Sequence, residues 1–333
     1  MLPFFIYAQI PSGAVAKYEL NTNATDIGGN NYNGTLTSTA NTTDRFGTAN
    51  SALAFTAGTS TGTLPSGLAT AMQTDFSLGY WFKTTMIANS STQWYGGNAL
   101  LDAEVCGNAN DWGTALIDGG KVSFGIGNTD ITIKSPSASY NDGNWHFVTA
   151  TRNASAGTII LYVDGVSVAS TAGTNTSALN APVLIGLGRN PCNAGGVFTG
   201  SLDDIIAYNR VLTATEVNNL YVFLSAFTLP VKWLSFTGEF AGKNIILKWE
   251  VEQTEGNDHF EAENSSDGIH FSMEGIIQSK DGVSSGSGKE MYHFSSTNPS
   301  AGTHFYRIRQ VDKDGNYSYS KTIKLVPNSI ARG

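Results

Sequence analysis

The stretch Gly-Ser-Leu-Asp-Asp-Ile-Ile-Ala-Tyr-Asn-Arg-Val-Leu, residues 200–212, has the composition of a buried strand that carries two adjacent carboxylates. Its run of apolar residues predicts a strand packed against other elements. Neighbouring side chains of a strand point to opposite faces of a sheet, so Asp203 and Asp204 should diverge. At least one of them should then lie near a packed surface, where an unpaired charge is costly and a partner is needed.

Short strands with tight turns surround this stretch in the first part of the chain. Residues 76–83, Phe-Ser-Leu-Gly-Tyr-Trp-Phe-Lys, alternate in the pattern of a half-buried strand, with Trp81 on the opposite face from the apolar row. Residues 158–170 predict a hairpin, because Asp164-Gly165 is a preferred type I′ turn. Many short strands with such turns indicate an antiparallel jelly-roll sandwich.

One short helix is expected in this part, over residues 214–223. Thr213 precedes it as the N-cap, and Glu216 follows three residues later. This spacing forms a capping box, in which each side chain bonds the other residue's backbone N–H.

The distribution of charge divides the chain. Residues 1–225 hold 8 Lys and Arg against 14 Asp and Glu, whereas the much shorter 226–333 holds 11 against 13. This change predicts two separately built modules, 10–225 and 231–327, joined by a linker at 226–230. Neither module has a basic stripe, which argues against nucleic acid as a partner. No run of 18 apolar residues occurs, so we expect no membrane insertion.

The first nine residues look like the end of a secretory signal, with an apolar run closed by Ala8. The run is short and lacks a basic region, and an N-terminal strand is the alternative. Low charge and abundant turn formers in the first module also favour a secreted or cell-surface protein. In an oxidising compartment Cys106 and Cys192, the only cysteines, would form a disulfide; in a reducing one they would be unrelated buried thiols.

The second module reads as a further series of strands, followed by a tail at 328–333. Seven strands in about 100 residues match the immunoglobulin-like or fibronectin III plan. Trp249 is the expected core aromatic, and Tyr306 is expected as a core or corner tyrosine. The strands are expected at about 231–240, 243–251, 258–264, 269–279, 290–296, 303–312 and 316–325.

Several stretches together resemble the bacterial laminin-G-like domain, a concanavalin A-like jelly roll, over residues 14–224. The second module, over 229–326, resembles the fibronectin-III-type module of secreted Bacteroidetes proteins, which a sorting domain for type IX secretion often follows. The resemblance implies an all-β chain with two sandwiches. It rests on Ala16–Leu20, Asn23–Asp26, Asn33–Thr35, Asp44–Gly47, Ala52–Phe55, Asp142–His146, Leu161–Gly165 and Gly200–Leu212 in the first module, and on Leu229–Leu234, Asp267–Phe271 and Tyr306–Gly315 in the second.

Motifs for catalysis are scarce. His146, the one histidine of the first module, is interpreted as a packed strand residue. A jelly-roll glycosidase needs carboxylates on one strand, as in Glu-x-Asp-x-x-Glu. Asp102 and Glu104 share one side of a strand, but Gly107 stands where the third carboxylate would be. We therefore expect no enzyme, with a carbohydrate-active hydrolase, or an ancillary module of one, as the alternative.

The laminin-G resemblance implies a structural calcium ion, which many members bind. Calcium takes carboxylate, carbonyl and amide oxygens. The first and last strands of this architecture lie side by side, so Asp26 and Asn30 are the expected co-ligands of Asp203 or Asp204. In the alternative interpretation, one Asp accepts hydrogen bonds from backbone amides and the other lies in solvent.

Aromatic residues in predicted loops offer platforms for sugars, whose apolar ring faces stack on π surfaces while amides and carboxylates bond the hydroxyls. Packing at the rim is the alternative for each. The chain is thus predicted to be a non-catalytic binding or adhesion protein for carbohydrate or a surface glycoconjugate; a structural matrix protein that binds protein partners is a further alternative. The candidate ligand-binding residues are Trp94, Tyr95, Asp111, Trp112, Arg189 and Asn190.

Overall fold

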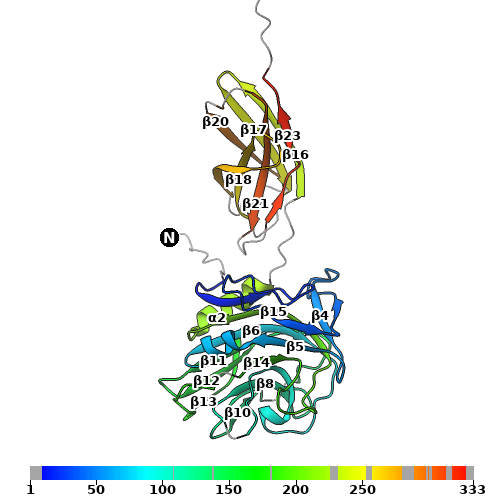
Figure 1. The fold of residues 1–333 in the computed structure, drawn as a ribbon, viewed down its shortest axis with the longest axis vertical. Coiled ribbons are helices and arrows are strands. Elements are labelled where there is room, and N and C mark those ends of the chain that lie inside the picture. Colours follow the sequence, from blue (N-terminus) through cyan, green and yellow to red (C-terminus); the bar gives the residue numbers. More distant parts are fainter. Residues whose placement is uncertain are drawn as a thin grey trace, which may run out of the picture. The chain divides into compact units, whose positions relative to one another are not determined.

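The computed structural model describes residues 10–107, 109–136, 139–180, 182–225, 232–252, 257–279, 289–297, 299, 302–312 and 317–327. The chain divides into two compact units, Met1–Ser225 and Ala226–Gly333 (Figure 1). The predicted signal remnant, linker and tail (1–9, 226–230 and 328–333) lie outside the described residues.

Two antiparallel sheets build the first unit. The eight-stranded sheet has the order β13-β12-β11-β6-β15-β4-β3, with β1 also paired to β15, and the seven-stranded sheet has the order β10-β9-β8-β7-β14-β5-β2. The elements are β1 (Ala14–Tyr18), β2 (Thr35–Thr37), β3 (Ala40–Thr42), β4 (Ala52–Phe55), β5 (Thr61–Pro65), α1 (Ser66–Ala71), β6 (Phe76–Lys83), the 3₁₀ turn η1 (Trp94–Gly96), β7 (Asn98–Asp102), β8 (Trp112–Ile117), β9 (Lys121–Ile126), β10 (Ile131–Lys134), β11 (Trp145–Asn153), β12 (Thr158–Val163), β13 (Val166–Ala172), β14 (Leu184–Leu187), β15 (Gly200–Tyr208) and α2 (Ala214–Ser225).

The main core of this unit lies between the two sheets, where the apolar row of β6 packs with residues such as Trp112 and Phe124 of the other sheet. Trp81 lies on the opposite face of β6, as predicted, but that face is buried too. It packs against Phe147 and Tyr221, which belong to a second cluster under α2. The prediction of a half-buried strand was therefore wrong, because α2 covers the side that the alternation assigned to solvent.

Short-range predictions in this unit are confirmed. Residues 158–170 form the hairpin β12–β13, with positive φ angles at Asp164 and Gly165 as a type I′ turn requires. The capping box also forms, with Thr213 N–H donating to Glu216 at 2.9 Å and Glu216 N–H donating to the Thr213 hydroxyl at 3.2 Å.

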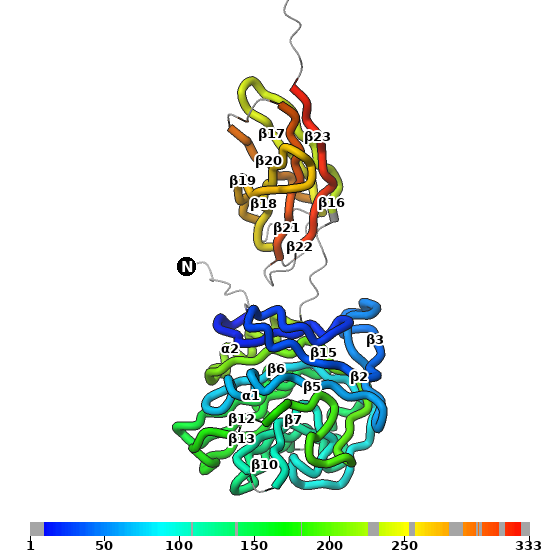
Figure 2. Tube along the Cα trace, viewed as in Figure 1, coloured from blue at the N-terminus to red at the C-terminus, as the bar shows by residue number. Residues whose placement is uncertain are grey.

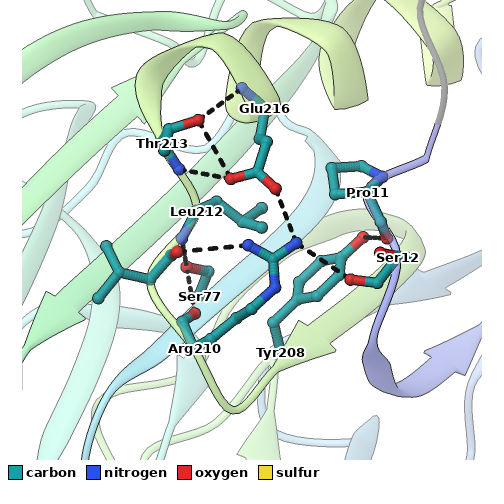
Figure 3. A network of polar contacts seen from close by, with 9 residues as sticks. Pro11, Ser12, Ser77, Tyr208, Arg210, Leu212, Thr213 and Glu216 are labelled. Atoms are coloured by element: carbon teal, nitrogen blue, oxygen red, sulfur yellow. Dashed lines mark hydrogen bonds and ion pairs between the residues drawn. The ribbon is translucent and has the colours of Figure 1, made fainter.

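The same helix start is tied to the N-terminal segment (Figure 3). Arg210 forms an ion pair with Glu216 at 2.7 Å and donates to the carbonyl of Ser12 at 3.0 Å, and the Tyr208 hydroxyl donates to the carbonyl of Pro11. These contacts join chain segments almost 200 residues apart, next to the antiparallel pair β1–β15. Figure 2 shows the N-terminal part of the described chain, in dark blue, running beside β15. No helix in the described ranges is long and apolar enough to cross a membrane.

The second unit contains two further antiparallel sheets, ordered β16-β17-β20 and β19-β18-β21-β22, with β23 paired to β21. Trp249 and Tyr306 lie in its core, as predicted. The last expected strand is split in two around Ser320, whose hydroxyl accepts the Ile308 N–H at 2.9 Å. The strands are β16 (Lys232–Ala241), β17 (Asn244–Glu252), β18 (Asn257–Ser265), β19 (Ser272–Gln278), β20 (Lys289–Thr297), β21 (His304–Asp312), β22 (Tyr317–Tyr319) and β23 (Ile323–Leu325).

Candidate functional site

The two carboxylates of the opening stretch face the same arginine. Arg45 Nη1 lies 2.8 Å from Asp203 Oδ2, and Nη2 lies 2.8 Å from Asp204 Oδ2. The prediction that they diverge was wrong, because β15 carries a bulge after Asp203 and Asp204 has a φ of +40°. A bulge inserts an extra residue and breaks the alternation of side chains. The cation that these carboxylates needed is a guanidinium, stacked over Trp81 at 4.8 Å.

Asp26, the predicted calcium co-ligand, is held by backbone N–H groups. Its Oδ1 accepts from Lys17 and Gly28, and its Oδ2 accepts from Tyr32. The side chain of Asn30 donates to the carbonyl of Val15.

This donor set does not fit a calcium ion as arranged, because N–H donors hold the carboxylates that would have to bind it. No group of three or more His, Cys, Asp or Glu side chains able to hold a metal occurs in the described part of the chain. These contacts give the predicted calcium site no support, and calcium binding itself stays a prediction.

A pocket of about 280 Å³ lies where several loops meet at one end of the seven-stranded sheet. The loop from β7 to β8 supplies Glu104, Gly107 and Asp111, and the turn from β9 to β10 supplies Asp130. These segments converge because Trp112, the first residue of β8, pairs with the last residue of β9. The 3₁₀ turn η1 closes one side with Trp94 and Tyr95.

Trp94 lies flat on the face of the sheet that is turned away from the main core. A Cβ atom at Gly125 would overlap its indole ring, and one at Gly113 would press on the same ring, so glycine is required at both positions. The indole is only 1% exposed, although it lines the pocket. Its neighbour Tyr95 stands edge-on to it, with ring centroids 5.7 Å apart, and is 36% exposed. Tyr95 is thus the aromatic surface that a ligand can reach.

Neutral amide donors hold the pocket carboxylates in place. The side-chain amide of Asn190 donates to Glu104 Oε2 and to the carbonyl of Tyr95, which links the two walls. Asp111 Oδ2 accepts the N–H of Val105 at 2.8 Å. A ligand would therefore meet oriented carboxylate and amide groups beside an aromatic ring.

Burial and mutual repulsion raise the pKa values of these acids. Burial raises the pKa of Asp111 to about 6, and the charges of Glu104 and Asp130 add to the rise. The hydrogen bond from the Val105 N–H lowers this pKa, but by less. Burial also raises the pKa of Glu104. Asp102, behind the pocket at the end of β7, has its pKa raised well above the usual range because it is fully buried, and its Oδ2 has no hydrogen-bond partner among the described residues.

The predicted disulfide is confirmed, with Cys106 bonded to Cys192 across 86 residues. Cys106 is next to the pocket residue Gly107. Cys192 donates its N–H to the side-chain oxygen of Asn190 at 2.7 Å. The bond therefore ties the β7–β8 loop to the segment that positions Asn190.

Among the predicted ligand-binding residues, Trp94, Tyr95 and Asp111 line the pocket, and Asn190 bonds two residues that line it. Trp112 does not lie in a loop. It begins β8 in the main core against Phe76, because the strand starts one residue earlier than its polar neighbours indicated. Arg189 is half-buried in an isolated bridge with Val197 and does not line the pocket.

Sequence reasoning did not assign Glu104, Gly107 and Asp130 to the ligand site, nor Arg45 to the Asp203–Asp204 pair. Glu104 was considered only together with Asp102, as half of a possible catalytic pair. Nothing in the sequence around Asp130 distinguishes it from a turn residue. Arg45 lies in a stretch that carried the laminin-G resemblance, which was the one available signal for its importance.

His146 is a strand residue, as predicted, and it lies between two acids. Its Nδ1 is 2.8 Å from Asp164 and its Nε2 is 3.2 Å from Asp142. Burial lowers the pKa of His146, but the bonds to Asp164 and Asp142 outweigh this, so the net pKa is raised.

Comparisons with known proteins agree with this architecture. Residues 56–218 match the family model Laminin_G_3, described as the concanavalin A-like lectin/glucanases superfamily. Domain 4 of AbnA, a GH43 extracellular arabinanase from Geobacillus stearothermophilus solved with arabinotriose, aligns with a TM-score of 0.50 and 18% identity over 63% of this chain and 98% of its own.

Two further solved structures align over both units. One described as HCR/D-Sa-GBL1/C has a TM-score of 0.50 and 14% identity over 92% of this chain and 73% of its own. The binding domain of Botulinum neurotoxin DC in complex with SialylT has a TM-score of 0.49 and 12% identity over 94% and 73%. No curated protein matches the chain. At these identities the likenesses to solved structures show the fold alone, and the match of residues 56–218 to the Laminin_G_3 model identifies a concanavalin A-like jelly-roll domain in the first unit.

Proposed function

We propose that this protein binds carbohydrate through the pocket beside Tyr95. The observation that carries the proposal is one pocket lined by an accessible aromatic ring and by Glu104 and Asp111, with Asn190 bonded to Glu104 from behind. A pyranose presents an apolar face and a rim of hydroxyls, which need a π surface and directional acceptors and donors respectively. The arabinanase domain solved with arabinotriose has the same fold, which is consistent with this use.

The protein acts in this proposal as a secreted or cell-surface binding and adhesion protein, not as an enzyme. Low charge and the disulfide of the first unit support an oxidising, extracellular setting. The second unit, with its two antiparallel sheets, is proposed as a fibronectin-III-type spacer of the kind found in Bacteroidetes proteins that use type IX secretion.

The test is a glycan array probed with the full chain, with and without EDTA, followed by calorimetry on the best oligosaccharide. We expect Tyr95→Ala to weaken binding about tenfold, close to the upper end of what an aromatic contact contributes. Asn190→Ala should also weaken binding, since Glu104 loses the amide that holds it. Ile27→Ala is the matched control, because it removes an exposed apolar side chain (50% exposed) from the N-terminal loop.

Two results would overturn the proposal. One is an array with no oligosaccharide bound above background. The other is binding that survives Tyr95→Ala and Asn190→Ala unchanged while both variants remain folded by circular dichroism.

A hydrolase is the second candidate, favoured by the raised pKa of Asp111, since an acid titrating near neutral pH suits general acid catalysis. Release of reducing sugar from the best-bound oligosaccharide, lost in both Glu104→Gln and Asp111→Asn, would establish it in place of simple binding.

A further inference from the structure

The pocket concentrates negative charge without a basic residue to balance it. Three of the six lining side chains, Glu104, Asp111 and Asp130, are carboxylates, and none of the six is lysine or arginine. Each acid raises the energy of its ionised neighbours, because like charges that share one hollow repel each other. An anionic sugar would meet this repulsion, and a neutral sugar would leave it unrelieved.

Elsewhere in the same unit, clustered carboxylates are paired with cations. Asp203 and Asp204 share Arg45, and the surface residue Asp118 bonds Lys121 and Lys134 at 2.8 and 2.9 Å. Within the described ranges no ion pair joins a lysine or arginine to the pocket acids. Their recorded donors are the neutral amides of Val105 and Asn190. A positively charged ligand would therefore gain more favourable electrostatic interaction in this pocket than beside the acids that are already paired with Arg45, Lys121 and Lys134.

A second observation comes from behind the pocket wall. Asp102 is completely buried, and its Oδ2 has no partner in the described part of the chain. Its carboxyl interacts with Glu104 and Asp111, and burial raises its pKa well above the usual range, which favours its neutral form. Asp102 is not part of the pocket lining, and it places one unpartnered buried carboxyl oxygen behind the three acids that line the pocket.

From these observations we infer that the ligand carries a protonated amine: the pocket binds an amino sugar of the glucosamine type. The ammonium group brings three N–H donors to Glu104, Asp111 and Asp130, and the sugar ring lies against Tyr95. Charge-assisted hydrogen bonds are about twice as strong as neutral ones, which gives the amine its selectivity. This inference rests on the proposed carbohydrate-binding function and names the sugar class.

The experiment compares tetramers of glucosamine, N-acetylglucosamine and glucose with the same β-1,4 backbone, together with a sialylated oligosaccharide, by calorimetry on the full chain. We expect the glucosamine tetramer to bind at least about tenfold tighter than the other two tetramers, and the sialylated one to bind most weakly. The preference should shrink as salt is raised, because exposed charges are screened.

Asp111→Asn and Asp130→Asn should each remove most of this preference, because each weakens binding of the glucosamine tetramer more than binding of the glucose tetramer. Asp111→Asn is expected to fold, since removing a charge whose pKa burial has raised does not lower the melting temperature. Asp118→Asn is the matched control. It removes a carboxylate outside the pocket and should keep the preference.

The outcomes separate the two ideas. Equal binding of the three tetramers, or a loss in Asp118→Asn as large as in Asp111→Asn, overturns the amine inference and leaves carbohydrate binding standing. Binding of none of the four oligosaccharides overturns the amine inference, and carbohydrate binding is overturned as well when the glycan array also shows no bound oligosaccharide.

Discussion

Replacing Arg45 by methionine should destabilise the first unit by several kilocalories per mole. The side chains of Arg45 and Asp203 are 10% and 2% exposed, and that of Asp204 is 19% exposed. Methionine can keep an apolar contact with Trp81 but removes the guanidinium that both carboxylates bond, and only the more distant charge of Lys17 still acts on Asp204. Breaking a buried ion pair by removing one partner costs about 3–5 kcal/mol. For a unit of this size that corresponds to a drop in melting temperature of about 6–20 °C.

The loss should depend on pH in a defined direction. Burial raises the pKa of both carboxyls, Asp204 raises that of Asp203 further, and Arg45 lowers both. Without Arg45 the pKa values rise again. A group with a raised pKa contributes stability that is present below its unfolded pKa of about 3.9 and is lost as pH rises. The deficit of the variant should therefore be smallest in acid, where both carboxyls are protonated in either protein, and should grow as pH rises through their folded-state pKa values.

The assay is calorimetric unfolding of the full chain at about pH 5 and 7.5, in which the transition of the first unit is the one expected to shift. Arg189→Met is the matched control, since this half-buried arginine lies in the same unit outside the cluster. Adding Asp203→Asn and Asp204→Asn to Arg45→Met should recover part of the loss. A loss below about 1 kcal/mol, far under the range for a buried pair, or an equal loss at both pH values, would refute the reasoning.

Other measurements check separate parts of the structure. Replacing Cys106 and Cys192 by alanine should cost about 4–5 kcal/mol in the chain-entropy model for a loop closed across 86 residues, read as the shift in denaturation midpoint; reductant without effect on the wild type would contradict this. His146→Gln should lose more stability at about pH 6 than at pH 8.5, because the raised pKa of His146 contributes stability below its unfolded value near 6.5 that is lost as pH rises. Gly125→Ala should cost about 1–3 kcal/mol by overpacking and alter tryptophan fluorescence, whereas Gly195→Ala, where a Cβ meets only the exposed side-chain oxygen of Asn193 at 3.3 Å, should cost less and leave the fluorescence unchanged. If millimolar EDTA leaves the melting temperature unchanged, the predicted structural calcium is wrong.

Features that depend on neighbours in sequence could be predicted without the fold. The Asp164-Gly165 hairpin and the Thr213–Glu216 capping box each need only residues a few positions apart, and their geometry follows from backbone preferences. The jelly roll itself was accessible because alternation and turn spacing repeat along the chain. The disulfide was predicted because the chain has only two cysteines and was expected in an oxidising compartment.

The partners of the charged groups depended on contacts between distant residues. Asp203 meets Arg45 across 158 positions, and a single bulge turned Asp204 toward the same guanidinium. No local sequence pattern predicts this bulge, because the alternation of apolar and polar residues describes only a regularly paired strand.

What the sequence determined by itself was the all-β class, the two-module division and the local turns and cap, because these follow from short-range backbone and side-chain preferences. The tertiary structure alone decided the site. It brought Tyr95, Glu104, Asp111 and Asp130 from three separate segments to one end of a sheet, and it moved Trp112 from an expected loop into the core. The register and order in which strands pair decide which loops meet, and the sequence of a single segment does not specify them.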